Sequence, residues 1–110
     1  MSSAVTFGVY TAKFPFLEND KEKIRPIIVV SKPYGRYNIV TVVPVSASTG
    51  QEEVDIKLLE WLQAGLIEPS IARVHRLSTL LQSELTSQLG TLSEKDQANL
   101  LRALKRLLGL

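Results

Sequence analysis

Residues 24–31, with the sequence I-R-P-I-I-V-V-S, predict the strand around which the fold is built. From Ile27 to Val30 every residue is β-branched, and such a run is typical of a fully buried strand. Pro26 has no backbone N–H to donate, which places it at the start or at an edge of that strand. Arg25 therefore lies where a loop enters the core. Its planar guanidinium suits a phosphate, although an arginine on the surface rim has the same sequence pattern.

The composition is that of one globular domain spanning residues 1–110, with 45% hydrophobic residues available for a core. Cysteine is absent and histidine occurs once, so we expect no disulfide, no metal and no cofactor. The N-terminal M-S-S-A-V-T lacks the features of a signal peptide, and we expect a cytoplasmic protein without membrane contact. The net charge of +2 permits a nucleic-acid partner but does not require one.

Further strands are predicted on both sides of the central segment. Residues 5–14 are rich in β-formers, and residues 37–46 follow a short turn that contains Pro33 and Gly35. The short connection predicts that residues 37–46 pair antiparallel with the central strand. Residues 52–58 alternate polar and apolar side chains, which indicates a half-buried strand.

Hydroxyl side chains follow the second of these strands. Ser46, Ser48 and Thr49 lie at or just beyond its end, and Gly50 closes the turn. Such hydroxyls can hold a phosphate, or they can do no more than stabilise the turn.

Residues 71–77 predict a strand that carries two functional candidates. Arg73 and His75 are two residues apart, so on a strand they point to the same face. His75 is the only histidine, and imidazole is the side chain whose usual pKa lies near neutrality. The alternative is an exposed polar face without chemistry.

The C-terminal segment, residues 81–110, is predicted to be helical. A short helix over residues 81–89 ends at Gly90, and Ser93 caps a second helix in a box-like S-x-x-D pattern. The leucines of this second helix form one apolar stripe, which we expect to pack on the sheet: Leu100, Leu101, Leu104, Leu107 and Leu108. The fold class is therefore mainly β, with strands within residues 5–80 and helices at the C-terminus.

Five segments together resemble the MazF/PemK toxin family: F-G-V-Y-T-A-K-F-P-F (7–16), K-I-R-P-I-I-V-V-S (23–31), V-V-P-V-S (42–46), A-G-L-I-E-P-S-I-A-R-V-H-R-L-S-T-L (64–80) and L-G-T-L-S-E-K-D (89–96). The resemblance implies an SH3-like β-barrel with C-terminal helices, a homodimer and the toxin half of a type II toxin–antitoxin pair. Family toxins are metal-independent endoribonucleases. They cut single-stranded RNA and leave a 2′,3′-cyclic phosphate and a 5′-hydroxyl.

The resemblance assigns four catalytic positions. Arg25 matches the catalytic arginine of the family, and Ser46 stands where many members have a threonine. Arg73 matches the arginine of an R-x-D arrangement, in which His75 replaces the acid. Imidazole can perform the same proton transfer near neutral pH, as either base or acid.

The resemblance also implies the partners. Arg25, Ser48, Thr49, Arg73 and Arg76 are the expected contacts with single-stranded RNA. The cognate antitoxin is expected to be an acidic, partly disordered protein that covers the same basic face.

Two other function classes remain open at this point. One is a binding-only toxin, like the gyrase-directed relatives of this barrel, which would act through its C-terminal helix. The other is a catalytically inactive SH3-like module, because Ser46 and His75 depart from the family pattern. The charged loop at residues 18–23 lacks the family's G-x-E-Q-x-G sequence, so its contacts with RNA or antitoxin do not transfer to this chain.

Overall fold

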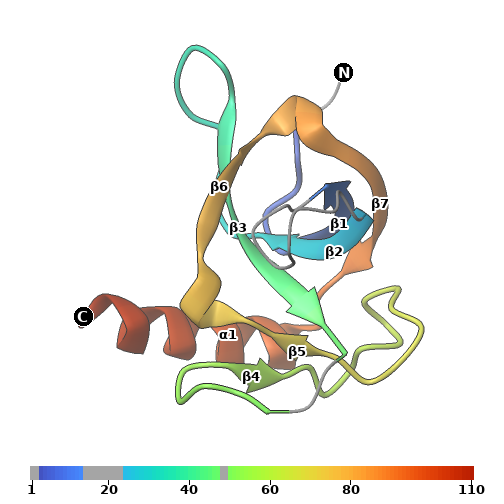
Figure 1. Ribbon diagram of the computed structural model, residues 1–110, viewed down its shortest axis with the longest axis vertical. Helices are drawn as coiled ribbons and strands as arrows, with labels where there is room; N and C mark the ends of the chain where they lie inside the picture. Colours follow the sequence, from blue (N-terminus) through green and yellow to red (C-terminus); the bar gives the residue numbers. More distant parts are fainter. Residues whose placement is uncertain (1–2, 14–23, 48–49) are drawn as a thin grey trace.

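The computed structural model describes residues 3–13, 24–47 and 50–110. Figure 1 shows a strongly curved sheet with the C-terminal helix lying across its lower end. In chain order the elements are β1 (Gly8–Lys13), β2 (Ile24–Val29), β3 (Ile39–Ser46), β4 (Ile56–Lys57), β5 (Ile71–Ala72), the 3-10 turn η2 (Val74–Arg76), β6 (Ser78–Leu81), the 3-10 turn η3 (Gln82–Glu84), β7 (Leu85–Thr91) and α1 (Glu94–Leu108).

One seven-stranded antiparallel sheet carries the fold. Its strands lie in the order β4-β5-β3-β2-β1-β7, and β6 pairs with β3. β3 is the central strand of the sheet, because it pairs with β2, β5 and β6. The sheet curls into a barrel-like shape (Figure 1), but no pairing within the described residues joins β7 to β4 or β6, so the predicted barrel is not closed.

The centre of β2 is buried on both faces, as its apolar run predicts. Ile28 belongs to one hydrophobic cluster, whereas Ile27 and Val29 belong to a second cluster on the opposite face. β3 alternates between the same two clusters. Leu100 and Ala103 of α1 complete the first cluster, so the helix covers one side of the paired strands. The prediction of an antiparallel pair at the centre of the fold is confirmed.

The last helix begins where its sequence predicts. The Ser93 hydroxyl accepts a hydrogen bond from the backbone N–H of Asp96 at 3.2 Å, which caps the helix N-terminus. The predicted apolar stripe is wrong at Leu101 and Leu108, which are 50% and 58% exposed on the flank of α1 that turns away from the sheet. No helix in the described part of the chain is long and apolar enough to cross a bilayer.

The predicted helix over residues 81–89 is wrong. After η3 the chain forms β7, which pairs antiparallel with β1. Leucines four residues apart, at Leu81, Leu85 and Leu89, fit one face of a helix and also one face of a strand, so only the pairing with β1 decides between them. The expected C-terminal helices are therefore the single helix α1.

Four predicted strands are shorter than expected. The strand over residues 37–46 begins at Ile39, because Asn38 still belongs to the turn. The strand over residues 5–14 begins at Gly8. The alternating segment 52–58 forms only the two residues of β4. The segment 71–77 leaves the sheet after Ala72, because the chain turns into η2 at Val74.

Candidate active site

A cleft opens where β2 and β3 separate. Their pairing covers Ile27–Val29 of β2, and β3 then pairs with β5 through Val45 and Ser46. Pro26 lies just before the part of β2 that pairs with β3, so its edge on this side has no partner strand. This confirms its predicted place at an edge. The cleft has a volume of about 270 Å³, and Arg25, Pro26, Val45, Ser46, Ala47, Gly65, Leu66, Ile67, Glu68, Ser70 and Leu89 line it.

Asp96 holds the segment that forms the opposite wall of this cleft. Its side-chain oxygens accept hydrogen bonds from the backbone N–H groups of Leu59 and Glu60, both at 2.9 Å. Further along this segment Gly65, with φ +88°, lies so close to β7 that a Cβ there would collide with the Leu89 carbonyl. A buried carboxylate and a glycine therefore fix the wall, which suits a site that must keep its shape.

Arg73 lies behind Ser46 and faces inward. Its Nε donates a hydrogen bond to the Ser46 hydroxyl at 2.9 Å, and its Nη1 donates to the carbonyl of Gly50. Nη1 also lies 3.7 Å from a carboxylate oxygen of Asp55. The Arg73 side chain is only 9% exposed, so it orients the groups around it and contributes little surface of its own.

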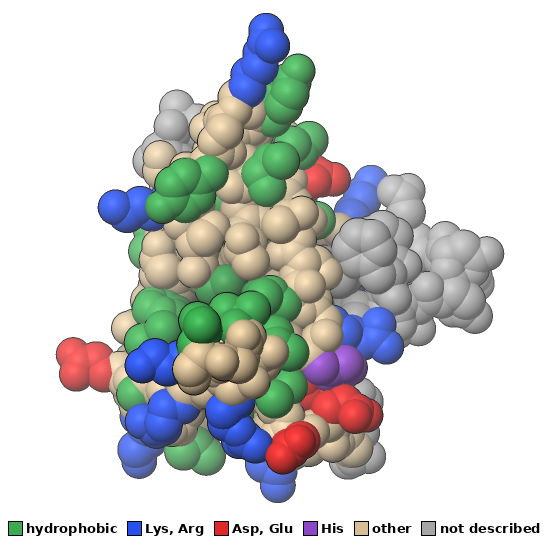
Figure 2. Space-filling model, turned by 90° about the vertical axis from the view of Figure 1, so that its left-hand side faces the viewer, with side chains coloured by type: hydrophobic (Ala, Val, Ile, Leu, Met, Phe, Trp, Pro, Cys, Tyr) green, Lys and Arg blue, Asp and Glu red, His purple; other side chains and the backbone are tan. Residues whose placement is uncertain are grey.

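Asp55 and His75 form the second half of the site. The ring nitrogen Nδ1 of His75 lies 2.8 and 3.0 Å from the two carboxylate oxygens of Asp55. The Asp55 side chain is fully buried, whereas 33% of the His75 side chain reaches solvent. Figure 2 shows the ring at the surface beside acidic side chains.

The surroundings of Asp55 favour its ionised form. Burial by itself would raise the pKa of this carboxyl, but it is outweighed by hydrogen bonds from the His75 ring and from the backbone N–H groups of Glu52 and His75. The charge of a protonated His75 acts in the same direction. The net effect is a pKa below the usual value, so Asp55 is a carboxylate at neutral pH.

An ionised Asp55 determines the tautomer of His75. A carboxylate only accepts hydrogen bonds, so Nδ1 must carry the proton that it donates to Asp55. In the neutral ring Nε2 then carries the lone pair and can take a proton from a reacting group. This arrangement of carboxylate, imidazole and outward-facing nitrogen is the one that supports general base catalysis.

The chain matches the family model of PemK-like, MazF-like toxins of type II toxin–antitoxin systems over residues 6–108. The chain belongs to this family. No curated protein matches this MazF-like toxin.

Solved structures share the fold of this MazF-like toxin. The MazE–MazF structure (Form II) from Deinococcus radiodurans has a TM-score of 0.77 and 17% identity, covering 100% of this chain and 99% of that one. The Mycobacterium tuberculosis toxin MazF-mt6 has a TM-score of 0.74 and 20% identity, covering 94% and 97%. A mycobacterial endoribonuclease in complex with its cognate antitoxin has a TM-score of 0.73 and 18% identity, covering 97% and 96%. At these identities the likeness is one of fold.

The structure of this MazF-like toxin brings the four predicted catalytic residues into one connected site. Arg25 and Ser46 line the same cleft, Ser46 is bonded to Arg73, and Asp55 joins Arg73 to His75. The prediction that Arg73 and His75 share one face of a strand is wrong, because Arg73 directly precedes η2 and His75 lies within it. The two side chains both contact Asp55.

The predicted RNA contacts are distributed differently. Arg76 is exposed on η2 and does not line the cleft. Ser48 and Thr49 lie outside the described residues. Within the described residues, no cluster of three or more histidine, aspartate or glutamate side chains is placed to hold a metal ion.

Sequence reasoning missed Asp55. The segment V-D-I-K-L predicts a strand with Asp55 on its polar face, which is ordinarily the solvated one. In the structure that face is covered by Arg73 and His75, so the carboxylate is buried. No local signal marks this residue, because its partners lie 18 and 20 positions further along the chain.

Proposed function

We propose that this toxin is a metal-independent endoribonuclease that cleaves single-stranded RNA. The 2′-hydroxyl attacks the adjacent phosphorus, the bond to the 5′-oxygen breaks, and the products carry a 2′,3′-cyclic phosphate and a 5′-hydroxyl. The observation that carries the proposal is the Asp55–His75 pair, joined through Arg73 and Ser46 to the cleft that holds Arg25.

His75 supplies the proton transfer in this proposal. Its Nε2 takes the proton of the 2′-hydroxyl as the oxygen attacks, and the buried carboxylate of Asp55 stabilises the imidazolium that forms. The departing 5′-oxygen takes its proton from solvent at the open side of the cleft. Asp55 does not touch the substrate, so it is a positioning residue.

Arg25 and Ser46 stabilise the charge that develops on the phosphorane. Arg25 lines the cleft from the rigid β2 strand, and its guanidinium charge suits a doubly charged phosphorane. The Ser46 oxygen accepts a hydrogen bond from Arg73, which orients this hydroxyl at the cleft. In the bound state the hydroxyl donates to a phosphate oxygen. The requirement for a 2′-hydroxyl restricts the substrate to RNA, and an open cleft suits unpaired strands.

The same proposal includes the partners of the toxin. An acidic, partly disordered antitoxin would cover Arg25 and Arg76, and two toxin chains would form a homodimer. Family membership, the exposed Arg76 and the position of Arg25 at the cleft support an antitoxin of this kind. Native mass spectrometry of the purified chain, alone and with its antitoxin, tests both assemblies.

The deciding experiment is incubation of the purified toxin with a long single-stranded RNA in the presence of EDTA. We expect discrete cuts whose ends carry cyclic phosphates and 5′-hydroxyls. Arg25→Ala should reduce the cleavage rate by about 10²–10³, because it removes a cation aimed at the developing charge. Arg36→Ala is the matched control, since this exposed arginine packs on Tyr37 and does not line the cleft.

Equal cleavage by wild type and Arg25→Ala would contradict the site assignment. Loss of cleavage on addition of EDTA would contradict the metal-independent mechanism. Intact RNA in the presence of folded wild-type protein would contradict the function itself and favour a toxin that acts by binding alone.

A further inference from the structure

Two hollows continue from the cleft around the outside of the molecule. The first shares Ala47 and Ser70 with the cleft, and the second lies between β4 and α1. We propose that together they form an extended track for the RNA strand, in which Trp61 stacks a base next to the cleavage site and cations on β4 and α1 bind phosphates further along. The track rests on the proposed function, since it extends the same substrate beyond the cleavage site.

The first hollow is suited to a flanking base. It has a volume of about 490 Å³, and Trp61, Pro69, Leu58, Leu59, Lys57 and Gly50 are among the residues that line it. Trp61 is half-buried and packs against the hydrophobic cluster beneath the sheet, so it is held firmly while part of it lines the hollow. A fixed aromatic wall stacks any base, and such stacking is tolerant of sequence.

The second hollow continues the path towards the basic side of α1. It shares Gln51, Lys57 and Leu59 with the first hollow, has a volume of about 460 Å³ and is also lined by Asn99, Arg102 and Arg106. Figure 2 shows Lys and Arg side chains gathered over this lower part of the molecule.

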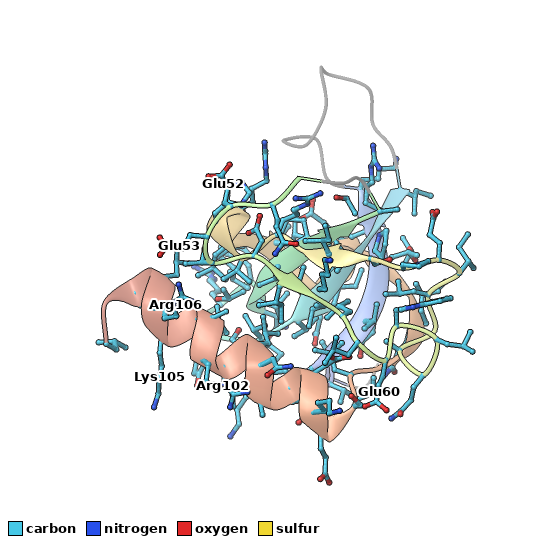
Figure 3. All side chains as sticks on the ribbon, turned by 90° about the horizontal axis from the view of Figure 1, so that it is seen from below. Glu52, Glu53, Glu60, Arg102, Lys105 and Arg106 are labelled. Carbon is cyan, nitrogen blue, oxygen red and sulfur yellow. The ribbon has the colours of Figure 1, made fainter. Side chains whose placement is uncertain are left out.

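The cations that line the second hollow remain available to phosphates. Arg106 lies 3.3 Å from Glu53, but both side chains are largely exposed and such surface pairs are weak. Arg102 donates to Asn99 on its own helix. Figure 3 shows Arg106 on the side of α1 near Glu53, whereas Lys105 points away from the sheet.

The order of these groups fits RNA better than an acidic peptide. A nucleotide chain alternates anionic phosphates with planar bases. The track alternates in the same way, from Arg25 to the apolar hollow beside Trp61, then to Lys57 and finally to Arg102. A peptide of acidic side chains would place carboxylates against the apolar walls of the first hollow, at a cost in desolvation.

The fluorescence of Trp61, the only tryptophan, tests the first part of the track. The probes are 2′-O-methyl oligonucleotides of mixed sequence, which cannot be cleaved, with lengths of about 4 and about 12 nucleotides to span the usual site sizes. The longer probe should change the emission and bind more tightly than the shorter one. Trp61→Phe should retain most of the affinity, whereas Trp61→Leu should lose about tenfold.

Charge variants test the second part. Lys57→Ala and Arg102→Ala should each reduce the slope of log affinity against log salt concentration by about 0.7, as expected for the loss of one phosphate contact. Each should also weaken binding of the longer probe about fivefold in 0.1 M salt. Lys105→Ala is the matched control, because it removes one positive charge from the same helix, and Lys105 does not line the second hollow. Circular dichroism confirms that each variant is folded.

The failure of this proposal can be told apart from the failure of the proposed function. RNA that is cleaved normally, with no change in Trp61 emission or equal effects of Arg102→Ala and Lys105→Ala, would overturn the track alone. An emission change with an oligoglutamate peptide but not with the oligonucleotides would overturn it in favour of a peptide site. Uncleaved RNA in the EDTA assay would refute the proposed function whatever the fluorescence shows.

Discussion

Two aspartates, Asp55 and Asp96, are buried in this molecule in similar ways. Each side chain accepts backbone hydrogen bonds from a neighbouring segment, Asp55 from Glu52 and His75, and Asp96 from Leu59 and Glu60. They differ in their side-chain partners. Asp55 contacts the ring of His75 and lies near Arg73, whereas Asp96 lies at the capped start of α1.

Burial and backbone hydrogen bonds are common to both aspartates, so these two features alone do not identify a functional carboxylate. Both carboxylate oxygens of Asp96 accept hydrogen bonds from backbone N–H groups, so Asp96 helps to fix the shape of the cleft wall. Asp55 also contacts the His75 ring, part of which reaches solvent, and in the proposed mechanism the charge of Asp55 stabilises this ring when it takes up a proton. The partner of the carboxylate distinguishes the two roles.

The largest expected effect follows Asp55→Asn. An amide group has an acceptor oxygen on one side and a donor N–H₂ on the other, so either His75 must change tautomer or the amide N–H₂ must face the Glu52 N–H and Arg73. We expect cleavage to fall by about 10⁴, as it does when a catalytic histidine is left in the wrong tautomer. Single-turnover cleavage across a pH series measures this loss.

A structural role alone would give a different result for Asp55→Asn. If the rate falls only in proportion to the fraction of unfolded protein, with an unchanged pH profile, the distinction between the two aspartates disappears. His75→Ala serves as the reference, since it should remove the same pH-dependent step.

A smaller and different effect is expected for Asp96→Asn. One of the two backbone N–H groups, on Leu59 or Glu60, would then face an amide donor, which should lower the free energy of unfolding by about 1–3 kcal/mol. Urea denaturation measures the change. Cleavage by the folded fraction should keep the pH profile of the wild type, and a shifted profile would show that Asp96 also acts on the chemistry.

The smallest expected effect concerns acid stability. The hydrogen bonds to Asp55 hold its pKa below the usual value of 3.8, so its contribution to stability is present above that value and is lost as the pH falls through the lower pKa of the folded protein. The wild type should therefore lose stability more steeply below about pH 4 than Asp55→Asn does. Urea midpoints measured from neutral to acidic pH test this. Parallel curves would show that the carboxylate is not stabilised in the folded state.

Parts of the site followed from the sequence, and others did not. Arg25, Ser46, Arg73 and His75 were predicted from the resemblance to the MazF/PemK family, and the structure connects them. Arg73 and His75 do not share a strand face, because the strand ends at Ala72 and His75 lies in η2.

Local sequence determined the features whose physics is local. The β-branched run of β2 favours burial on both faces, and the Ser93 hydroxyl accepts a hydrogen bond from the Asp96 N–H within the first turn of α1. Only the tertiary structure decided that residues 85–91 form a strand and that Asp55 is buried beside His75. Both depend on segments distant in sequence, since β7 pairs with β1 and Asp55 meets a ring 20 residues away. Leucine spacing and strand alternation fit more than one local structure, and long-range pairing selects among them.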